Sequence, residues 1–224
     1  MFWKVKNEKM SGKINLLRKI NWYLMKKFNF GLKRAYPFRT STIFAKEYFK
    51  GKDDLIAIEI GTHRGESAEY FLNKIPFIKK LYCIDPYDKN FVINGEFAPI
   101  HFNVAKKRLR KFSHKCEFIK ETSNNALKIL KQKGIKADFV YIDGLHTYEQ
   151  VKRDIENYFP LVKREGIISG HDIQNEEVTK AIFEFCCKNR IIPLIKEMDW
   201  IIIKKSKNSH GGKDVNKKTV GELK

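Results

Sequence analysis

Two stretches decide the fold that this sequence predicts: Ala137-Asp-Phe-Val-Tyr-Ile-Asp143-Gly-Leu-His146 and, about one helix later, Gly166-Ile-Ile-Ser-Gly-His171-Asp172. Each is an apolar run that stops near an acidic residue, and each acid has a histidine close by. Apolar runs of this length, rich in β-branched residues and flanked by chain breakers, are typical of buried parallel strands. Because reactive groups on such sheets lie at the carboxyl ends of the strands, we expect both acids and both histidines in one small volume.

Apolar runs alternate with helical patterns through the middle of the chain. The expected strands are Leu55–Ile60, Leu81–Ile84, Glu117–Lys120, Phe139–Ile142, Gly166–Ser169, Ile191–Lys196 and Trp200–Lys204. The expected helices lie near Ser67–Lys74, Ile100–Lys111, Asn124–Lys133, Tyr148–Phe159 and Glu176–Asn189. This alternation predicts right-handed crossovers, a parallel sheet and a single three-layer α/β domain. Only a short connector separates the last two runs, so the last strand is expected to run antiparallel to the others.

The net charge of +19 is concentrated at the two ends of the chain. Residues 1–50 hold 13 Lys or Arg and 2 acids, and residues 204–224 hold 7 and 2, whereas residues 51–203 hold 25 and 22. A basic groove for nucleic acid would more naturally run through the body of the domain, so the charge argues against a nucleic-acid partner. We therefore divide the chain into a basic N-terminal extension (1–50), the α/β domain (51–205) and a disordered basic tail (206–224).

The N-terminal extension contains one helical pattern. Within Ile14–Phe28, the apolar residues Leu17, Ile20, Leu24 and Phe28 recur at helical spacing between basic residues, which predicts a basic amphipathic helix. A helix of this kind can pack on the domain as a cap or lie against a membrane surface. The cap is the favoured interpretation, and peripheral membrane contact stays as the alternative.

The rest of the composition predicts a cytoplasmic protein. No run is long enough for a transmembrane helix, and the first residues lack the apolar core and cleavage site of a secretory signal. The four cysteines, Cys83, Cys116, Cys186 and Cys187, show no CxxC spacing. Reduced thiols in the cytosol are therefore expected, and a zinc site is not.

A glycine-containing loop follows the first expected strand: Glu59-Ile-Gly61-Thr-His-Arg-Gly65-Glu-Ser67. A glycine directly after a strand lets the backbone turn tightly and approach a ligand, although a structural turn would explain Gly61 equally well. The GxxxG spacing differs from the GxGxxG of dinucleotide folds. The next strand ends at Asp85, about twenty residues later, where doubly wound folds place an acid on ribose hydroxyls. A turn or helix cap is the alternative for Asp85.

With these features together, the chain resembles class I S-adenosylmethionine-dependent methyltransferases. More narrowly, it is similar to the family that includes the metal-dependent macrolide-sugar O-methyltransferases. The residues that carry this resemblance are Glu59-x-Gly61-x-x-x-Gly65-x-Ser67, Ile84-Asp85, Asp138-Phe-Val-Tyr-Ile-Asp143-Gly-x-His146-x-Tyr148-Glu149 and Gly170-His-Asp172, within residues 54–204. The glycine loop is shared by many nucleotide-binding folds, whereas the two acid–histidine motifs are far more specific.

The resemblance implies a fold and a cofactor site. The fold is a doubly wound, mostly parallel seven-stranded sheet with a reversed last strand. The cofactor is S-adenosylmethionine, with its methionine moiety near Glu59 and Gly61, in the loop that runs on through Gly65 and Ser67, and its ribose on Asp85. The position after the third strand, where the family contacts adenine, holds Thr122 and Ser123, which are weaker candidates.

The resemblance also implies a metal-assisted reaction. It assigns Asp143 and Asp172 to a divalent cation, with Asp143 thereby part of the catalytic pair, and His146 to the general base. A cation bound by carboxylates lowers the pKa of an alcohol, and a nearby imidazole takes its proton; hard oxygen ligands favour Mg²⁺ or Mn²⁺. One departure is His171, which stands where the sugar-modifying relatives carry an acid and joins the candidate metal ligands. Singly, Asp143 could cap a helix and His171 could be a satisfied semi-buried histidine.

The predicted function is transfer of a methyl group from S-adenosylmethionine to a hydroxyl oxygen of a small polyhydroxylated acceptor, with a sugar suggested by the resemblance alone. Two alternatives stay open. Two histidines with carboxylates also suit an Fe²⁺-dependent hydroxylase. A methyltransferase-like protein without catalysis could instead bind a nucleotide, or bind nucleic acid through its basic ends.

Overall fold

The computed structural model describes residues 40–88, 92–93 and 96–205, together with Ile20, Tyr23, Leu24, Lys27 and Phe28. Its main sheet has seven strands in the order β5-β2-β1-β6-β7-β9-β8. These strands are β1 (Leu55–Ile60), β2 (Ile78–Ile84), β5 (Cys116–Ile119), β6 (Ala137–Ile142), β7 (Val162–Gly170), β8 (Leu194–Lys196) and β9 (Asp199–Ile203). The predicted seven-stranded sheet is therefore confirmed.

The strand directions follow the prediction as well. β5, β2, β1, β6 and β7 pair in parallel, and β9 enters antiparallel between β7 and β8. The chain winds from β1 to β2 and β5 on one side and to β6 and β7 on the other. This reversal of strand order places the crevice of the fold at the carboxyl ends of β1 and β6.

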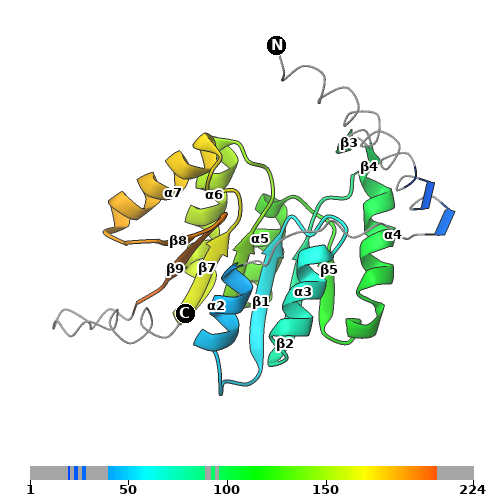
Figure 1. The fold of residues 1–224 in the computed structure, drawn as a ribbon, viewed down its shortest axis with the longest axis horizontal. Coiled ribbons are helices and arrows are strands. Elements are labelled where there is room, and N and C mark those ends of the chain that lie inside the picture. Colours follow the sequence, from blue (N-terminus) through cyan, green and yellow to red (C-terminus); the bar gives the residue numbers. More distant parts are fainter. Residues whose placement is uncertain are drawn as a thin grey trace, which may run out of the picture.

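Helices cover both faces of the sheet (Figure 1). They are α2 (Thr40–Tyr48), α3 (Glu66–Lys74), α4 (Ala98–Arg108), α5 (Ser123–Gln132), α6 (Tyr148–Tyr158) and α7 (Glu176–Asn189), with two 3₁₀ turns at Arg110–Phe112 and Phe159–Leu161. A two-stranded hairpin of β3 (Val92–Ile93) and β4 (Glu96–Phe97) precedes α4. The sequence did not predict α2 or this hairpin.

Two apolar layers explain why the strands read as nearly continuous apolar runs. Alternate strand residues (Ala57, Leu81, Phe139, Ile167 and Ile201) pack with residues of α2 and α3 on one face. Their neighbours (Ile58, Tyr82, Val140, Ile168 and Ile202) pack with residues of α5, α6 and α7 on the other face. Because both faces are buried, the strands lack the polar alternation of a half-exposed sheet.

Helix α2 is fixed to the domain by residues far along the chain. The Ser41 backbone N–H donates to Oδ2 of Asp199 at 2.8 Å, and the Thr40 hydroxyl donates to Oε2 of Glu197 at 2.9 Å. Ala45 and Phe49 are buried in the layer that α3 shares. The chain therefore packs against the sheet from Thr40 onward, and the predicted domain boundary at residue 51 remains a prediction.

The predicted amphipathic helix Ile14–Phe28 lies largely outside the described residues. The five residues of it that are described are helical, and the backbone carbonyl of Phe28 accepts a hydrogen bond from Nζ of Lys107 at 2.6 Å. The predicted tail 206–224 lies wholly outside them. Among the helices that the structure describes, none combines the length and apolar character needed to cross a bilayer.

Candidate active site

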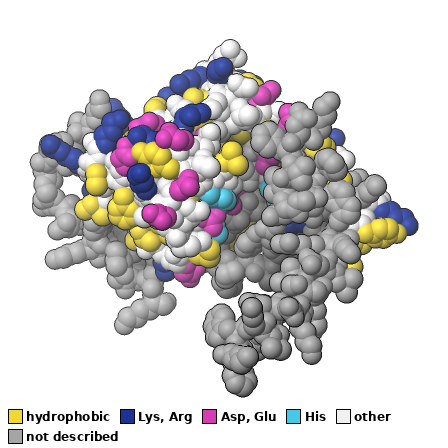
Figure 2. Space-filling model, turned by 90° about the horizontal axis from the view of Figure 1, so that it is seen from above, with side chains coloured by type: hydrophobic (Ala, Val, Ile, Leu, Met, Phe, Trp, Pro, Cys, Tyr) yellow, Lys and Arg dark blue, Asp and Glu magenta, His cyan; other side chains and the backbone are white. Residues whose placement is uncertain are grey.

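The candidate residues gather at one edge of the sheet, the carboxyl edge of its parallel strands. Gly61 directly follows β1, Asp85 follows β2, Asp143 follows β6 and His171 follows β7. Figure 2 looks down on this edge and shows histidine and acidic side chains next to one another near its middle. Four separate strand ends thus contribute to one site, as parallel packing requires.

Gly61 connects the glycine loop to the next parallel strand. Its φ is +89°, a conformation that favours glycine. A Cβ built here would lie 1.9 Å from the backbone oxygen of Asp143. The backbone N–H of Gly61 also donates to the carbonyl of Ile84 at 2.9 Å. Only glycine therefore allows the loop after β1 to lie directly against the end of β6.

Gly65 is a glycine because of its backbone conformation and its packing against α4. It is the N-cap of α3 with a φ of +72°, and a Cβ built on it would come within 3.2 to 3.4 Å of Leu109 and Ala105 at the end of α4. Its missing side chain therefore permits close packing of α4. The sequence assigned Gly65 to cofactor binding, and the contact that the structure shows is with a helix.

Asp85 is buried and holds the glycine loop in place. Oδ2 accepts a hydrogen bond from the backbone N–H of His63 at 2.9 Å, and Oδ1 accepts one from the N–H of Tyr87 at 3.2 Å. The Tyr87 hydroxyl closes the unit by donating to the His63 carbonyl at 2.8 Å. Burial raises the pKa of Asp85, and the two N–H bonds oppose that rise. Each carboxylate oxygen can accept a second bond, so this geometry still permits ribose binding.

The other predicted cofactor residues lie on β1, in α3 and at the start of α5. Glu59 and Ser67 are buried, on β1 and in the first turn of α3. Thr122 is the N-cap of α5, with Oγ1 accepting from the Asn125 N–H at 3.4 Å. Ser123 Oγ accepts from Nε2 of Gln150 at 3.0 Å. The structure shows each of these four residues buried or in a contact within the fold.

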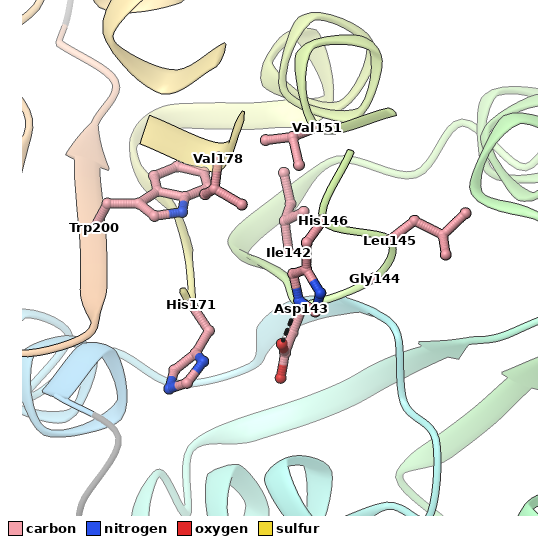
Figure 3. Close-up of a pocket in the computed structure, with 9 residues that line it drawn as sticks. All are labelled: Ile142, Asp143, Gly144, Leu145, His146, Val151, His171, Val178 and Trp200. Atoms are coloured by element: carbon pink, nitrogen blue, oxygen red, sulfur yellow. Dashed lines mark ion pairs between the residues drawn. The ribbon is translucent and has the colours of Figure 1, made fainter. Parts of the chain in front are cut away.

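A second set of residues forms a compact cluster at the ends of β6 and β7. One ligand atom each from Asp143, His146 and Asp172 lies within 4.8 Å of the others. His146 Nε2 is 2.8 Å from Oδ2 of Asp172 and 3.7 Å from Oδ1 of Asp143. Figure 3 shows the His146 and Asp143 side chains facing each other, with His171 to one side. The predicted convergence of the two motifs is what the structure shows.

The backbone explains this convergence. The Asp143 N–H donates to the carbonyl of Ile60 at 2.8 Å, and the His171 N–H donates to the carbonyl of Ile142 at 3.2 Å. These bonds continue the parallel ladders just past the strand ends. Asp172 then adopts a φ of +58°, which is uncommon for a residue with a side chain and is consistent with a constrained functional position.

Charge dominates the cluster. Hydrogen bonding to Asp143, and next to Asp172, raises the pKa of His146 to about 10. The same contact with His146, followed by that with His171, holds the pKa of Asp172 well below its usual range. Without a cation, the arrangement is therefore an imidazolium between two carboxylates.

The donor set fits a divalent cation. The two carboxylates suit Mg²⁺ or Mn²⁺, and a transition metal would also accept the His146 imidazole, which lies within 4.8 Å of both, in place of its role as a base. His171, which the sequence placed among the metal ligands, lies outside this three-residue group. Its Nδ1 is instead 3.0 Å from the second oxygen of Asp172, Oδ1. His171 thus contacts the outer oxygen of a carboxylate whose other oxygen faces His146.

Sequence reasoning missed one residue beside this cluster, Trp200. It is the second residue of β9 and pairs with Gly170 at the end of β7. Because β9 runs antiparallel, its amino end lies at the carboxyl edge of the parallel strands. The hairpin spacing that predicted the direction of β9 could therefore have placed Trp200 at the site.

The chain belongs to a methyltransferase domain family. The family profile, described as a methyltransferase domain, matches residues 58–173. This match covers just over half of the chain and includes the glycine loop and both acid–histidine motifs. The resemblance to methyltransferases is therefore confirmed at the level of the family.

Two curated relatives are similar over part of their length. An uncharacterised protein of Acanthamoeba polyphaga mimivirus is 31% identical over 126 residues, and one of Sinorhizobium fredii is 23% identical over 133 residues. The matched stretches are 55% and 57% of this chain, respectively. The chain spans 54% of the mimivirus protein and 14% of the S. fredii protein.

Several solved structures share the fold. An O-methyltransferase from Bacillus cereus in complex with SAH has a TM-score of 0.58 at 13% identity, covering 84% of this chain and 90% of its own. CalS11, a TDP-rhamnose 3′-O-methyltransferase, has a TM-score of 0.55 at 11% identity, and the match covers 73% of this chain and 76% of CalS11. MycE, in complex with Mg, SAH and mycinamycin VI, has a TM-score of 0.57 at 14% identity, and the match covers 77% of this chain and 50% of MycE. These similarities confirm the predicted fold.

Proposed function

We propose that this chain transfers a methyl group from S-adenosylmethionine to a hydroxyl oxygen of a small-molecule acceptor, with a divalent cation assisting. One observation carries the proposal. In a chain of the methyltransferase family, Asp143, His146 and Asp172 form a compact charged cluster, and Gly61 lies directly against the backbone of Asp143. The cofactor loop and the charged cluster are therefore neighbours.

The residues would divide the work between them. The loop after β1 and the Asp85 carboxylate would hold the cofactor over β1 and β2, with the methyl group toward the end of β6. Methyl transfer is an in-line displacement, in which the new C–O bond forms as the C–S bond breaks, so positioning of the acceptor is the main demand. His146 would accept the hydroxyl proton at Nε2, the nitrogen that faces both acids.

Asp143 and Asp172 would hold the cation. When bound there, the cation would lower the pKa of the acceptor hydroxyl and orient its oxygen. With Asp143 and Asp172 engaged as ligands of the cation, the imidazole of His146 would be able to take a proton. His171, bonded to the other oxygen of Asp172, would keep that carboxylate oriented.

The acceptor is proposed to be a small hydroxylated molecule, with a sugar as the first class to test. Two neighbours support this choice: CalS11, whose name specifies TDP-rhamnose, and MycE, whose complex contains Mg and mycinamycin VI. The sequence motifs that resemble sugar-modifying enzymes point the same way.

Thermal unfolding with candidate ligands tests the proposal. S-adenosylhomocysteine, NAD and ATP would each be added with Mg²⁺, with Mn²⁺ and with EDTA. A ligand at a hundred times its Kd stabilises the fold by about 2.7 kcal/mol, which is readily measured. We expect Tm to rise with S-adenosylhomocysteine and to stay unchanged with NAD and with ATP. A rise with NAD or ATP instead, or no rise with any ligand, would contradict the proposal.

A further inference from the structure

The N-terminal segment presents an apolar face that the domain does not cover. The structure describes five residues of the predicted amphipathic helix, Ile20, Tyr23, Leu24, Lys27 and Phe28, and all five are helical. They recur at intervals of three and four residues, so they share one face of the helix. Leu24 is partly buried, whereas Ile20, Tyr23 and Phe28 are 42%, 54% and 49% exposed. A helix that caps the domain would bury these side chains, so their exposure favours an external partner.

Two aromatic rings and one ammonium group form a compact unit on this face. The rings of Tyr23 and Phe28 meet edge to face, with their centroids 6.4 Å apart. Nζ of Lys27 lies 5.4 Å from the centroid of each ring and donates to the Tyr23 hydroxyl at 2.9 Å. Side chains with an apolar body and a polar tip are typical of the boundary between water and lipid. The unit can therefore place its rings in the acyl region while the Lys27 ammonium stays among the headgroups.

A lysine of α4 holds the end of this helix. Nζ of Lys107 donates to the Phe28 carbonyl at 2.6 Å, and Figure 1 shows the short blue helical segments on the outer side of α4. The last turn of α4 carries Lys106, Lys107 and Arg108, and the sequence has no acid from residue 98 to residue 111. Lys106 and Lys107 are exposed. The apolar face therefore lies next to positive charge that belongs to the domain.

The charge of the segment identifies the kind of partner. Residues 14–28 contain four Lys or Arg and no acid, and residues 1–50 contain 13 Lys or Arg and 2 acids, a net charge of +11. Attraction to anionic headgroups and burial of apolar side chains together hold a peripheral helix on a membrane. Nucleic acid would use the same charge but would leave the aliphatic side chain of Ile20 exposed. An anionic lipid surface uses both features.

We propose that this face binds the surface of an anionic membrane. Ile20, Tyr23 and Phe28 insert at the boundary between headgroups and acyl chains, and the helix lies in the plane of the interface. The basic side chains of the helix, with Lys106 and Lys107 of α4, contact the anionic headgroups. The proposal is independent of the proposed methyl transfer, because it uses none of the residues at the carboxyl edge of the sheet.

Sedimentation of the full chain with vesicles tests the proposal. Vesicles of phosphatidylcholine alone are compared with vesicles of phosphatidylcholine and phosphatidylserine in equal amounts, at low and at high salt. Phe28→Ser removes one inserted ring, and Phe183→Ser is its matched control, because Phe183 is 44% exposed on α7. Lys27→Gln removes one charge, with Lys188→Gln on α7 as its control. Circular dichroism shows that each variant is folded.

The wild-type chain should bind the mixed vesicles at least about tenfold more tightly than the neutral ones, and salt should weaken this binding. Phe28→Ser should weaken it about tenfold and Lys27→Gln about fivefold. Both control variants should stay within about twofold of the wild type. No binding to the mixed vesicles, equal binding to both kinds of vesicle, or equal losses in Phe28→Ser and Phe183→Ser would each overturn the proposal.

A single-stranded RNA serves as the competing polyanion in the same assay. We expect the RNA to leave the protein on the mixed vesicles, because it offers the apolar face no place to insert. If the RNA instead displaces the protein from the vesicles and binds Phe28→Ser as tightly as the wild type, the basic segment serves nucleic acid and the membrane proposal is wrong.

Discussion

The two halves of the carboxyl edge are built differently. At β1 and β2, the glycine loop is held by backbone bonds and by a buried Asp85 that accepts two backbone N–H groups. At β6 and β7, charged side chains face one another, and His146 is 44% exposed. Backbone hydrogen bonds therefore form the first half, and charged side chains that contact one another form the second.

Under the proposed function, this difference separates cofactor binding from binding of the acceptor and the cation. A cofactor that is always the same can be held by backbone geometry, which changes little with side-chain substitution. An acceptor and a cation need side chains of a particular charge. We therefore expect substitutions in the cofactor half to affect folding and cofactor affinity, and those in the acceptor half to affect cation binding and turnover.

The largest effect is expected where the two halves touch. Gly61→Ala would place a Cβ 1.9 Å from the Asp143 oxygen at a φ of +89°, so strain and overpacking together should cost roughly 4 kcal/mol of unfolding free energy. Gly134→Ala is the matched control, because Gly134 has a φ of +66° and open space around it; about 1 kcal/mol is expected there. Equal losses in urea unfolding would contradict the close contact.

A buried acid beside Ser123 should make stability depend on pH. Burial is the main cause that raises the pKa of Asp154 from 3.8 to about 6. Because the folded state holds this proton more tightly than the unfolded state, the contribution of Asp154 to stability is most favourable below about pH 4. This contribution falls by up to about 3 kcal/mol as the pH rises past 6.

The Asp154→Asn variant tests this dependence. It keeps the contact with Gln150, whose Nε2 is 2.9 Å from Oδ1 of Asp154, through a rotated amide and removes the titration. The difference in unfolding free energy between wild type and variant should shift in favour of the variant from pH 4 to pH 7. A difference that is constant with pH would show that the pKa of Asp154 is the same in the folded and unfolded states.

Asp172→Asn should weaken cation binding and leave cofactor binding nearly unchanged. Asparagine tolerates the φ of +58° at this position but removes a charged ligand of the cluster. We expect about 100-fold weaker Mn²⁺ binding, or about 2.7 kcal/mol, measured by electron paramagnetic resonance titration. Binding of S-adenosylhomocysteine should stay within about threefold, and Asp54→Asn, an exposed acid paired with Lys79, should change neither. Unchanged Mn²⁺ affinity in Asp172→Asn would remove Asp172 from the cation site.

Asp85→Ala should give the smallest change in affinity, and it should weaken cofactor binding where Asp172→Asn weakens Mn²⁺ binding. Loss of the carboxylate frees the N–H groups of His63 and Tyr87 and removes the proposed ribose contact, so S-adenosylhomocysteine should bind about tenfold more weakly, or about 1.4 kcal/mol. Mn²⁺ binding should be unchanged. If calorimetry shows the same affinity for S-adenosylhomocysteine in the variant, Asp85 holds the loop and does not bind the cofactor.

Much of the fold and the centre of the cluster follow from local sequence. The apolar runs ending at Asp143 and Asp172 show where strands stop, and parallel packing then brings their ends together. Contacts between distant elements were not predicted. Helix α2 depends on Asp199, which is 158 residues further along, and Gly65 is needed by α4. Neither has a local signal in the sequence.

Trp200 illustrates the same limit within the site. Its position in a short apolar strand indicates a core residue, and it is buried as such a residue should be. Its place beside the charged cluster arises from the reversed direction of β9 and from the space left by Gly170. Likewise, the sequence grouped His171 with the metal ligands, whereas its contact is with one oxygen of Asp172.

A crystal structure of the chain grown with S-adenosylhomocysteine and Mn²⁺ tests the division of this edge most directly. We predict S-adenosylhomocysteine over the ends of β1 and β2, with a ribose hydroxyl on Asp85, and an anomalous Mn²⁺ peak at Asp143 and Asp172. S-adenosylhomocysteine bound elsewhere, or a folded edge without Mn²⁺ between these two carboxylates, would contradict the account.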